Sequence, residues 1–254
     1  MSFISDIVNS VGRNIIQQTA YSVGRALNNS SFFGTLSNIV GLFTGSKGFG
    51  TEPQDANNFN LPISADPTAA IPVVYGTSYV KGLLVDARQG ETGCDMYYAL
   101  VLCEVTGTVL STSQQSVITV PEVWWGDKRV SFSGNSANVE SSYDADGNEV
   151  ESINGHVKMW LYTNGSANPG SFGGGGGGSG AAWEIMPGWT TNHTMDNLVF
   201  AIVYVEYDAP DDVRGLETVT FKVKNTCTLP GDVMYDYMTN PIYGAGIPVE
   251  DIDV

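Results

Sequence analysis

Short segments rich in valine, tyrosine and leucine follow one another from residue 73 onward, separated by turns that contain glycine, asparagine or aspartate. Such segments are typical of β-strands. No segment is followed by an amphipathic helix of about 10 to 15 residues, which a doubly wound parallel sheet requires. The sequence therefore predicts a mainly β fold, an antiparallel sandwich or barrel. The predicted strands cover 73–75, 79–87, 97–105, 117–125, 128–132, 156–162, 198–207 and 218–224.

Polar and apolar residues alternate along the last predicted strand, 218–224. Successive side chains of a strand point to opposite faces of its sheet. We therefore expect one face of this strand to contact water and the other to be buried. The polar positions are Thr218, Thr220, Lys222 and Lys224, and the apolar positions are Val219, Phe221 and Val223.

Residues 3–28 carry apolar side chains three and four positions apart, with polar residues between them. This spacing places the apolar side chains on one stripe of a helix. A weaker stripe over residues 32–43 precedes the glycine-rich run 45–50. We predict an amphipathic helical arm at residues 1–50 and an extended linker at 51–70. The first stripe comprises Ile4, Ile7, Val8, Val11, Ile15, Ile16, Ala20, Val23 and Leu27.

Two arrangements of this arm stay open on the sequence alone. The helix packs on the body of its own chain, or it docks on another subunit through apolar residues such as Ile7, Val11 and Ile15. Insertion into a membrane is disfavoured because few basic residues flank the stripe.

Residues 231–243 predict a short helix near the end of the chain. Asp232 is placed to cap it, Val233, Tyr237 and Met238 recur at helical spacing, and Pro241 stops it. In contrast, residues 168–182 contain six consecutive glycines and are expected to form a mobile loop. A phosphate cradle is not expected there, because no lysine and no suitable helix follow the glycines.

Acidic residues outnumber basic residues 27 to 11, which gives a net charge of −16. The arm carries +2, so the rest of the chain carries −18 and the arm is suited to an acidic surface. A field of this sign repels phosphate backbones and anionic membranes, so neither nucleic acid nor a membrane is an expected partner. No apolar run reaches 18 residues and no secretory leader is recognisable. We expect a soluble protein made in the cytoplasm, with its three cysteines, Cys94, Cys103 and Cys227, reduced.

The oxygen-rich run 144–148, Asp-Ala-Asp-Gly-Asn, lacks the later glutamate of a calcium loop. We interpret it as a hairpin turn in which Gly147 adopts positive φ. The acidic residues at 208–212 and 250–253 are interpreted as solvated loops. We therefore expect no metal and no cofactor.

Cys103 and His156 are one conceivable nucleophile pair, but Cys103 lies in the apolar run 99–103 and is interpreted as a core residue. His156 and His193 are interpreted as turn or edge residues. The five tryptophans would suit a sugar-stacking platform, yet one member of the pair 124–125 is expected to face the core. These residues identify no catalytic site.

One segment near the end of the chain carries a distinctive order of residues. It reads Asp232-Val-Met-Tyr-Asp-Tyr-Met-Thr-Asn-Pro-Ile-Tyr-Gly-Ala-Gly-Ile-Pro248. It resembles the signature of tail-tip proteins of long-tailed bacteriophages, the lambda J-like host-specificity or tail-hub family, in which a short helix precedes Asn/His-Pro-x-Tyr-Gly.

Earlier residues are similar to the start of the hub region in the same family. They are Ile71-Pro-Val-Val-Tyr-Gly76, running to Gly82, then Asp86-Ala-Arg88 and Tyr98-Ala-Leu-Val-Leu-Cys-Glu104. The family usually has glycine after Leu-Cys-Glu, where this chain has Val105. Members are usually longer and continue into further hub and fibre-attaching domains. The chain then corresponds to the amino-terminal hub portion, a split gene product or a shortened form.

The resemblance implies a β-rich hub domain at residues 71–254 and a structural role in the virion, at the distal end of the tail tube. Such hubs close the tube and connect it to the baseplate or fibre. The implied partners are further copies of the chain in a homotrimer, the distal tail or tube protein, and baseplate or fibre proteins. No enzymatic activity is implied.

Four residues of the distinctive segment are expected to form a rigid junction. Pro241 fixes φ, Gly244 permits a tight turn, and Tyr235 and Tyr243 pack the helix onto the body.

Two other functions are compatible with the same residues. A carbohydrate-binding β-sandwich would use exposed tryptophans and acidic loops. A hydrolase such as a tail lysozyme would need a pair of carboxylates, for which the sequence shows no obvious motif.

Overall fold

The computed structural model describes residues 69–133, 136–167, 180–207 and 213–252. The predicted arm at 1–50, with Ile7, Val11 and Ile15, lies outside the described residues, as do residues 51–68 of the linker and 168–179 of the glycine-rich segment. The arm and the mobile loop therefore stay predictions.

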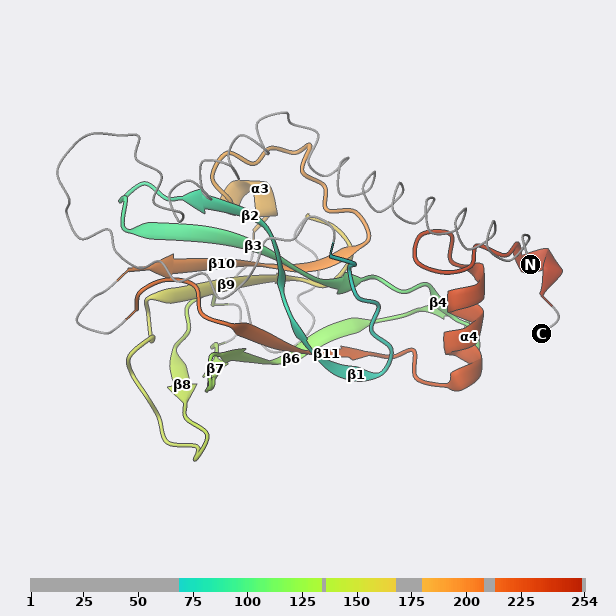
Figure 1. Cartoon of the computed structure of the whole chain (residues 1–254), viewed down its shortest axis with the longest axis horizontal. Coiled ribbons are helices and arrows are strands. Elements are labelled where there is room, and N and C mark those ends of the chain that lie inside the picture. Colours follow the sequence, from blue (N-terminus) through green and yellow to red (C-terminus); the bar gives the residue numbers. More distant parts are fainter. Residues whose placement is uncertain (1–68, 134–135, 168–179, 208–212, 253–254) are drawn as a thin grey trace, which may run out of the picture.

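Two sheets make up the body, and all the pairings between their strands are antiparallel (Figure 1). The five-stranded sheet has the order β1 (Thr77–Lys81), β11 (Val219–Asn225), β6 (Ile118–Trp125), β7 (Lys128–Ser131) and β8 (Ser141–Tyr143). The four-stranded sheet has the order β2 (Leu83–Gln89), β3 (Asp95–Glu104), β10 (Leu198–Glu206) and β9 (Val157–Tyr162). The strands β4 (Thr108–Val109) and β5 (Gln114–Gln115) pair with each other.

The inner faces of the two sheets share one apolar core, to which Leu100 and Met159 come from one sheet and Phe221 and Val123 from the other. Each sheet is open and ends in two edge strands. The mainly β, antiparallel fold expected from the sequence is thus confirmed. The barrel alternative is wrong, because the strands form two packed sheets and do not close on themselves.

A second apolar cluster covers the outer face of the four-stranded sheet. Phe200 and Ile202 of β10 point into this cluster, whereas Val199 and Val203 point into the core between the sheets. Because β10 is buried on both faces, its sequence is apolar almost throughout, as in buried strands generally. In contrast, β11 alternates between buried and more exposed residues, which confirms the amphipathic strand predicted there.

The chain crosses from one sheet to the other at Gly82. Residues 79–87 were expected to form one strand, but β1 pairs with β11 and β2 pairs with β3. At Gly82 an added Cβ would lie 2.6 Å from the Cβ of Leu100. The prediction of one strand over 79–87 is therefore wrong. The strand is interrupted at Gly82 because only a residue without a side chain fits where the chain passes over Leu100.

The other long strands lie within one or two residues of their predicted bounds. The predicted strand 73–75 is reduced to one bridge, between Val73 and Glu104. The strands β4, β5 and β8 were not expected, because two or three residues are too few to show a period.

Three short helical elements are described: α3 (Ala182–Ile185), α4 (Pro230–Thr239) and the 3₁₀ turn η1 (Val249–Asp251). The helix α4 confirms the helix expected near the chain's end. Its N-cap is Leu229, so the capping role expected of Asp232 is wrong. The helix α3 was not anticipated, and it begins at Ala182, the last residue of the predicted loop. No described helix has the length and apolar character needed to cross a bilayer.

We predict that Gly82→Ala lowers the free energy of unfolding by about 1–3 kcal/mol, because the new methyl group overlaps Leu100 in a packed core. Chemical denaturation of the two proteins measures this difference. Gly231→Ala is the matched control, because an added Cβ at Gly231 meets nothing within 4 Å. Equal stability of Gly82→Ala and the unchanged protein would contradict the prediction.

Candidate interaction site around helix α4

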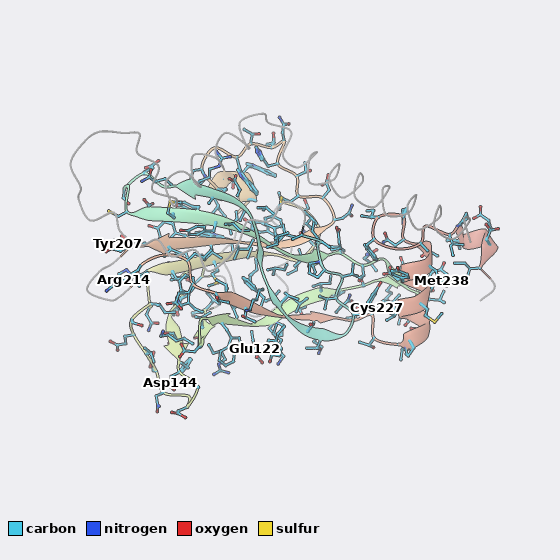
Figure 2. The ribbon with its side chains drawn as sticks, in the orientation of Figure 1. Glu122, Asp144, Tyr207, Arg214, Cys227 and Met238 are labelled. Atoms are coloured by element: carbon cyan, nitrogen blue, oxygen red, sulfur yellow. The ribbon has the colours of Figure 1, made fainter. Side chains whose placement is uncertain are left out.

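Helix α4 lies at one end of the sandwich, beside β4, with Met238 on it (Figures 1 and 2). Two of its residues, Asp232 and Asp236, are each only 4% exposed. They stand one helical turn apart and therefore lie on the same face of the helix. The side of α4 that packs on the body thus carries two carboxylates, a group that is seldom buried without partners.

The carboxylate of Asp236 accepts three hydrogen bonds. The hydroxyls of Tyr75 and Tyr243 donate to Oδ2 at 2.6 and 2.7 Å, and the backbone N–H of Gly107 donates to Oδ1 at 2.8 Å. These donors come from three separate parts of the chain. Asp236 therefore joins the segment before β1, the segment before β4 and the segment after α4.

Asp232 makes a second attachment one turn earlier. The backbone N–H and the hydroxyl of Ser111 donate to its two oxygens at 2.8 and 2.7 Å. Ser111 lies in the turn between β4 and β5. Together the two aspartates fix both the position and the rotation of α4, because hydrogen bonds to charged acceptors are short and directional.

Burial raises the pKa of the Tyr243 and Tyr75 hydroxyls above the ordinary tyrosine value, and the hydrogen bond to the Asp236 carboxylate raises it further. Both phenols therefore keep their protons at neutral pH and remain donors. Both hydroxyls can therefore donate to Asp236 across the pH range in which the tyrosines stay protonated.

The chain doubles back after α4 and satisfies carbonyls at the end of the helix. Ala245 donates to the carbonyl of Tyr237 and Ile247 donates to that of Met238, both at 2.8 Å. The side-chain oxygen of Asn240 accepts from the backbone N–H of Ile242 at 2.8 Å. This return loop replaces a glycine cap, since the last helical carbonyls would otherwise lack donors.

Two glycines allow the close approach of these segments. An added Cβ at Gly107 would lie 2.7 Å from Oδ1 of Asp236. At Gly244 it would collide with the carbonyl oxygens of Tyr237 and Asn240. Any side chain at either position would push the return loop or β4 away from α4.

The structure places the four predicted junction residues around this helix, in different roles. Tyr243 donates to Asp236, and Gly244 sits against the helix end. Tyr235 is half-buried, and Pro241 is exposed. Sequence reasoning missed Asp236 and its donor Tyr75. The signal that identifies Asp236 is its spacing of four from Asp232, which puts both acids on one face of a short helix.

The opposite face of α4 is apolar and exposed. Met234 is 63% exposed and Tyr237 is 54% exposed, and the nearby Leu229 and Val249 are exposed to a similar degree. An ordinary surface helix presents its apolar stripe to the core. Helix α4 differs, because its buried side carries two aspartates while Met234 and Tyr237 are exposed, so its outer side is a candidate surface for protein association.

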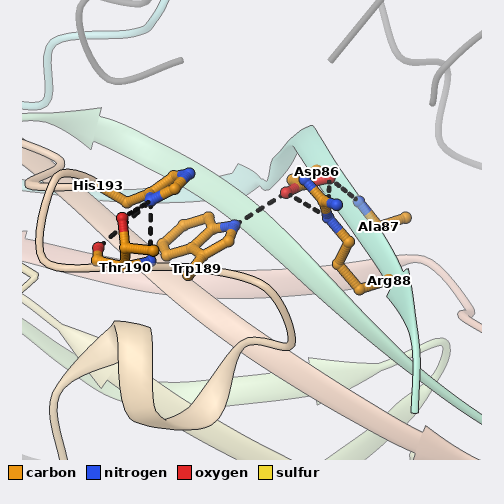
Figure 3. Close-up of polar contacts among 6 residues, drawn as sticks. All are labelled: Asp86, Ala87, Arg88, Trp189, Thr190 and His193. Atoms are coloured by element: carbon orange, nitrogen blue, oxygen red, sulfur yellow. Dashed lines mark hydrogen bonds and ion pairs between the residues drawn. The ribbon is translucent and has the colours of Figure 1, made fainter. Parts of the chain in front are cut away.

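Another buried carboxylate, that of Asp86, lies on strand β2 of the four-stranded sheet (Figure 3). It accepts hydrogen bonds from the backbone N–H of Ala87 at 2.8 Å, from Nε of Arg88 at 2.9 Å and from Nε1 of Trp189 at 2.8 Å. The irregularity in the pairing of β2 with β3 falls between Leu84 and Asp86. Asp86 therefore ties the Trp189 segment to strand β2.

The ring of His193 stacks on Trp189, with centroids 5.2 Å apart and an angle of 9° between the planes. The backbone N–H of Thr190 donates to Nδ1 of His193 at 3.0 Å (Figure 3). Both contacts hold a turn together, which confirms the interpretation of His193 as a turn residue.

The structure separates Cys103 from His156. Cys103 pairs with Val199 at the start of β10, whereas the carbonyl of His156 accepts from the N–H of Glu206 at its end. The two residues are about 20 Å apart at the rise of a strand. Cys103 is buried, which confirms its assignment to the core, and burial raises the pKa of its thiol to about 12.

Among the tryptophans, Trp125 and Trp189 are buried and the other three are half-buried. Trp125 faces the core next to half-buried Trp124, as the alternation along a strand predicts. A sugar platform needs exposed ring faces, and none of the five tryptophans is in the exposed class.

The run 144–148 forms a turn. Gly147 has φ +85°, and Oδ1 of Asp144 accepts from the backbone N–H groups of Asp146 and Asn148 at 3.0 and 2.8 Å. This confirms the hairpin interpretation. In the described part of the chain, no group of three or more histidine, cysteine, aspartate or glutamate side chains is placed to hold a metal ion.

Glu104 ends β3 and is buried, and its backbone N–H donates to the carbonyl of Pro72 at 3.0 Å. Burial raises the pKa of its carboxyl to about 7. The carboxyl therefore changes charge near neutral pH in the folded chain.

No protein-family model matches the chain, and no curated protein matches it either.

We predict that Asp236→Asn lowers the free energy of unfolding by about 2–4 kcal/mol, because an amide offers one acceptor oxygen where three donors converge. Urea denaturation measures the effect. Asp251→Asn, a change at an exposed residue of η1, is the control and should leave the free energy within about 0.5 kcal/mol. Equal losses in the two variants would contradict the role of Asp236.

The raised pKa of Glu104 predicts a pH-dependent stability. In the unfolded chain the carboxyl ionises near its ordinary pKa of about 4.3. The protonated carboxyl therefore stabilises the folded chain fully below that pH, and this stabilisation is lost as the pH rises through the folded-state pKa of about 7. Wild type and Glu104→Gln should be similarly stable near pH 4, and wild type should be up to about 3 kcal/mol less stable near pH 8. Parallel stability curves of the two proteins across this range would rule the effect out.

Proposed function

We propose that the chain is a structural component of a bacteriophage tail tip, a hub protein that closes the distal end of the tail tube and joins it to baseplate or fibre proteins. In this role it has no enzymatic activity. It assembles as a homotrimer within the virion and contacts the distal tail or tube protein.

The observation that carries this proposal is the convergence of the two stretches that resemble tail hubs. The later stretch forms α4 and its return loop, and the earlier stretch supplies Tyr75, whose hydroxyl donates to Asp236. Asn225 adds a second link between distant segments, because its Nδ2 donates to the carbonyl of Val74 at 2.7 Å. Residues far apart in the sequence thus meet at one junction, and a shared structural unit explains why both stretches resemble the same family.

Two further properties support a structural role. The outer face of α4 offers exposed apolar side chains for contact at one end of the sandwich. The strongly acidic body suits a conduit for DNA, because like charge weakens the adsorption of phosphate backbones.

Immunogold electron microscopy of particles from the source phage, or of a lysate if the source is a lysogen, tests this function. Antibody raised against residues 71–227 is expected to label the tail tip alone. Label elsewhere on the particle, or on soluble material only, would overturn the proposal. Binding of the isolated monomer to a glycan array in that case would favour the carbohydrate-binding alternative.

A further inference from the structure

Positive charge in this acidic protein gathers on the outer face of the five-stranded sheet. Strand β11 pairs with β1 on one side and with β6 on the other, and β7 follows β6. Val80, Val130, Phe221 and Val223 point into the core. The residues next to them along each strand therefore face outward. Among the described cations they are Lys81, Arg129, Lys222 and Lys224.

Glu122 is the acid that the described strands place on this face (Figure 2). Lys222 already neutralises it, through a contact of 2.8 Å between Nζ and Oε1. Lys222 and Arg129 also lie over the rings of Tyr79 and Tyr143, at 5.6 and 5.4 Å.

Lys81 and Lys224 are exposed, and neither forms an ion pair with a residue that the structure describes. The face therefore carries a net positive charge and has unpaired ammonium groups at its surface.

An acidic segment projects from the edge of the same sheet. Residues 140–151 surround β8 and contain five acids and no cation. Four of the acids, Glu140, Asp146, Glu149 and Glu151, are exposed. The fifth, Asp144, holds the turn, which keeps the hairpin in a fixed shape at the position labelled in Figure 2.

We propose that the basic face of the five-stranded sheet binds the acidic hairpin 140–151 of a second copy of this chain. The charges of the two surfaces are complementary, and both are built on strands, so their shapes are set before contact. A contact between two unlike surfaces forms a closed ring when the rotation between copies divides a full turn, and a trimer is one such ring. The inference rests on the proposed function only for the choice of a closed homo-oligomer.

A nucleic acid is the other anionic partner that a basic sheet face with aromatic rings attracts. The acidic hairpin argues against it, because residues 140–151 lie beside this face in the same chain and repel a phosphate backbone that runs along it. A protein hairpin instead presents a few carboxylates at the end of a narrow element.

Sedimentation velocity of the full chain tests the inference. At about 0.15 M salt the repulsion between distant charges is largely screened, and close ion pairs still act, whereas about 1 M salt weakens those pairs too. We expect an oligomer at the lower salt concentration and a rise in its dissociation constant of at least about tenfold at the higher one. A monomer at both concentrations would overturn the inference.

Charge reversal at the two surfaces makes the test specific. Lys224→Glu and Glu149→Lys should each raise the dissociation constant by about tenfold or more, and the two changes together should recover part of the loss. Lys158→Glu and Glu206→Lys are the controls, because they make the same changes of charge on the four-stranded sheet. An oligomer that responds equally to the controls, or not at all to Lys224→Glu, would place the contact elsewhere and overturn the inference.

A fluorescent single-stranded oligonucleotide added to wild type and to Lys224→Glu identifies the competing partner. Binding by wild type that Lys224→Glu abolishes would overturn the inference in favour of a nucleic acid. These outcomes are separate from those for the proposed function, because immunogold labelling of the tail tip does not depend on the surface through which copies meet.

Discussion

The pairing of β3 with β10 buries apolar side chains on both faces of the four-stranded sheet, and the other layers are arranged around it. On one face the five-stranded sheet completes the core. On the other face α3 and the Trp189 segment cover the strands, and Asp86 fixes that segment in place. Burial of both faces removes far more apolar surface from water than a single core would, and apolar burial is the main favourable contribution to folding.

Helix α4 is attached to this body by polar contacts, although its outer side is apolar. Five hydrogen bonds to Asp232 and Asp236 hold it against the body. Such an anchor leaves Met234 and Tyr237 exposed for contact with another molecule, on a helix whose backbone is held in place. A backbone that is ordered before contact loses little entropy on association, which suits a permanent assembly. The proposed contact between the basic face and the acidic hairpin would add orientation to such an assembly, because charge pairs select partners and register more than they add affinity.

The long strands and helix α4 could be predicted because the pattern of apolar and polar residues that indicates them is local in sequence. Strand β11 shows its alternation directly, and β10 shows its burial by an apolar run. The break at Gly82 could not be predicted, because the clash that requires glycine comes from Leu100 on another strand. The short strands β4, β5 and β8 depend on their partners for the same reason.

The sequence by itself determined the mainly β antiparallel class, the acidic character and the helix that stops before Pro241, because composition, net charge and short-range spacing decide these properties. The tertiary structure alone decided that the sheets stay open, that Tyr75 and Tyr243 meet at one carboxylate, and that α4 turns its apolar side outward. The contacts of Asp236 with Tyr75 and Gly107 and of Asp232 with Ser111 join residues more than a hundred positions apart. No local pattern records which acceptor a buried hydroxyl will find, so the role of Asp236 emerges only when the chain is folded.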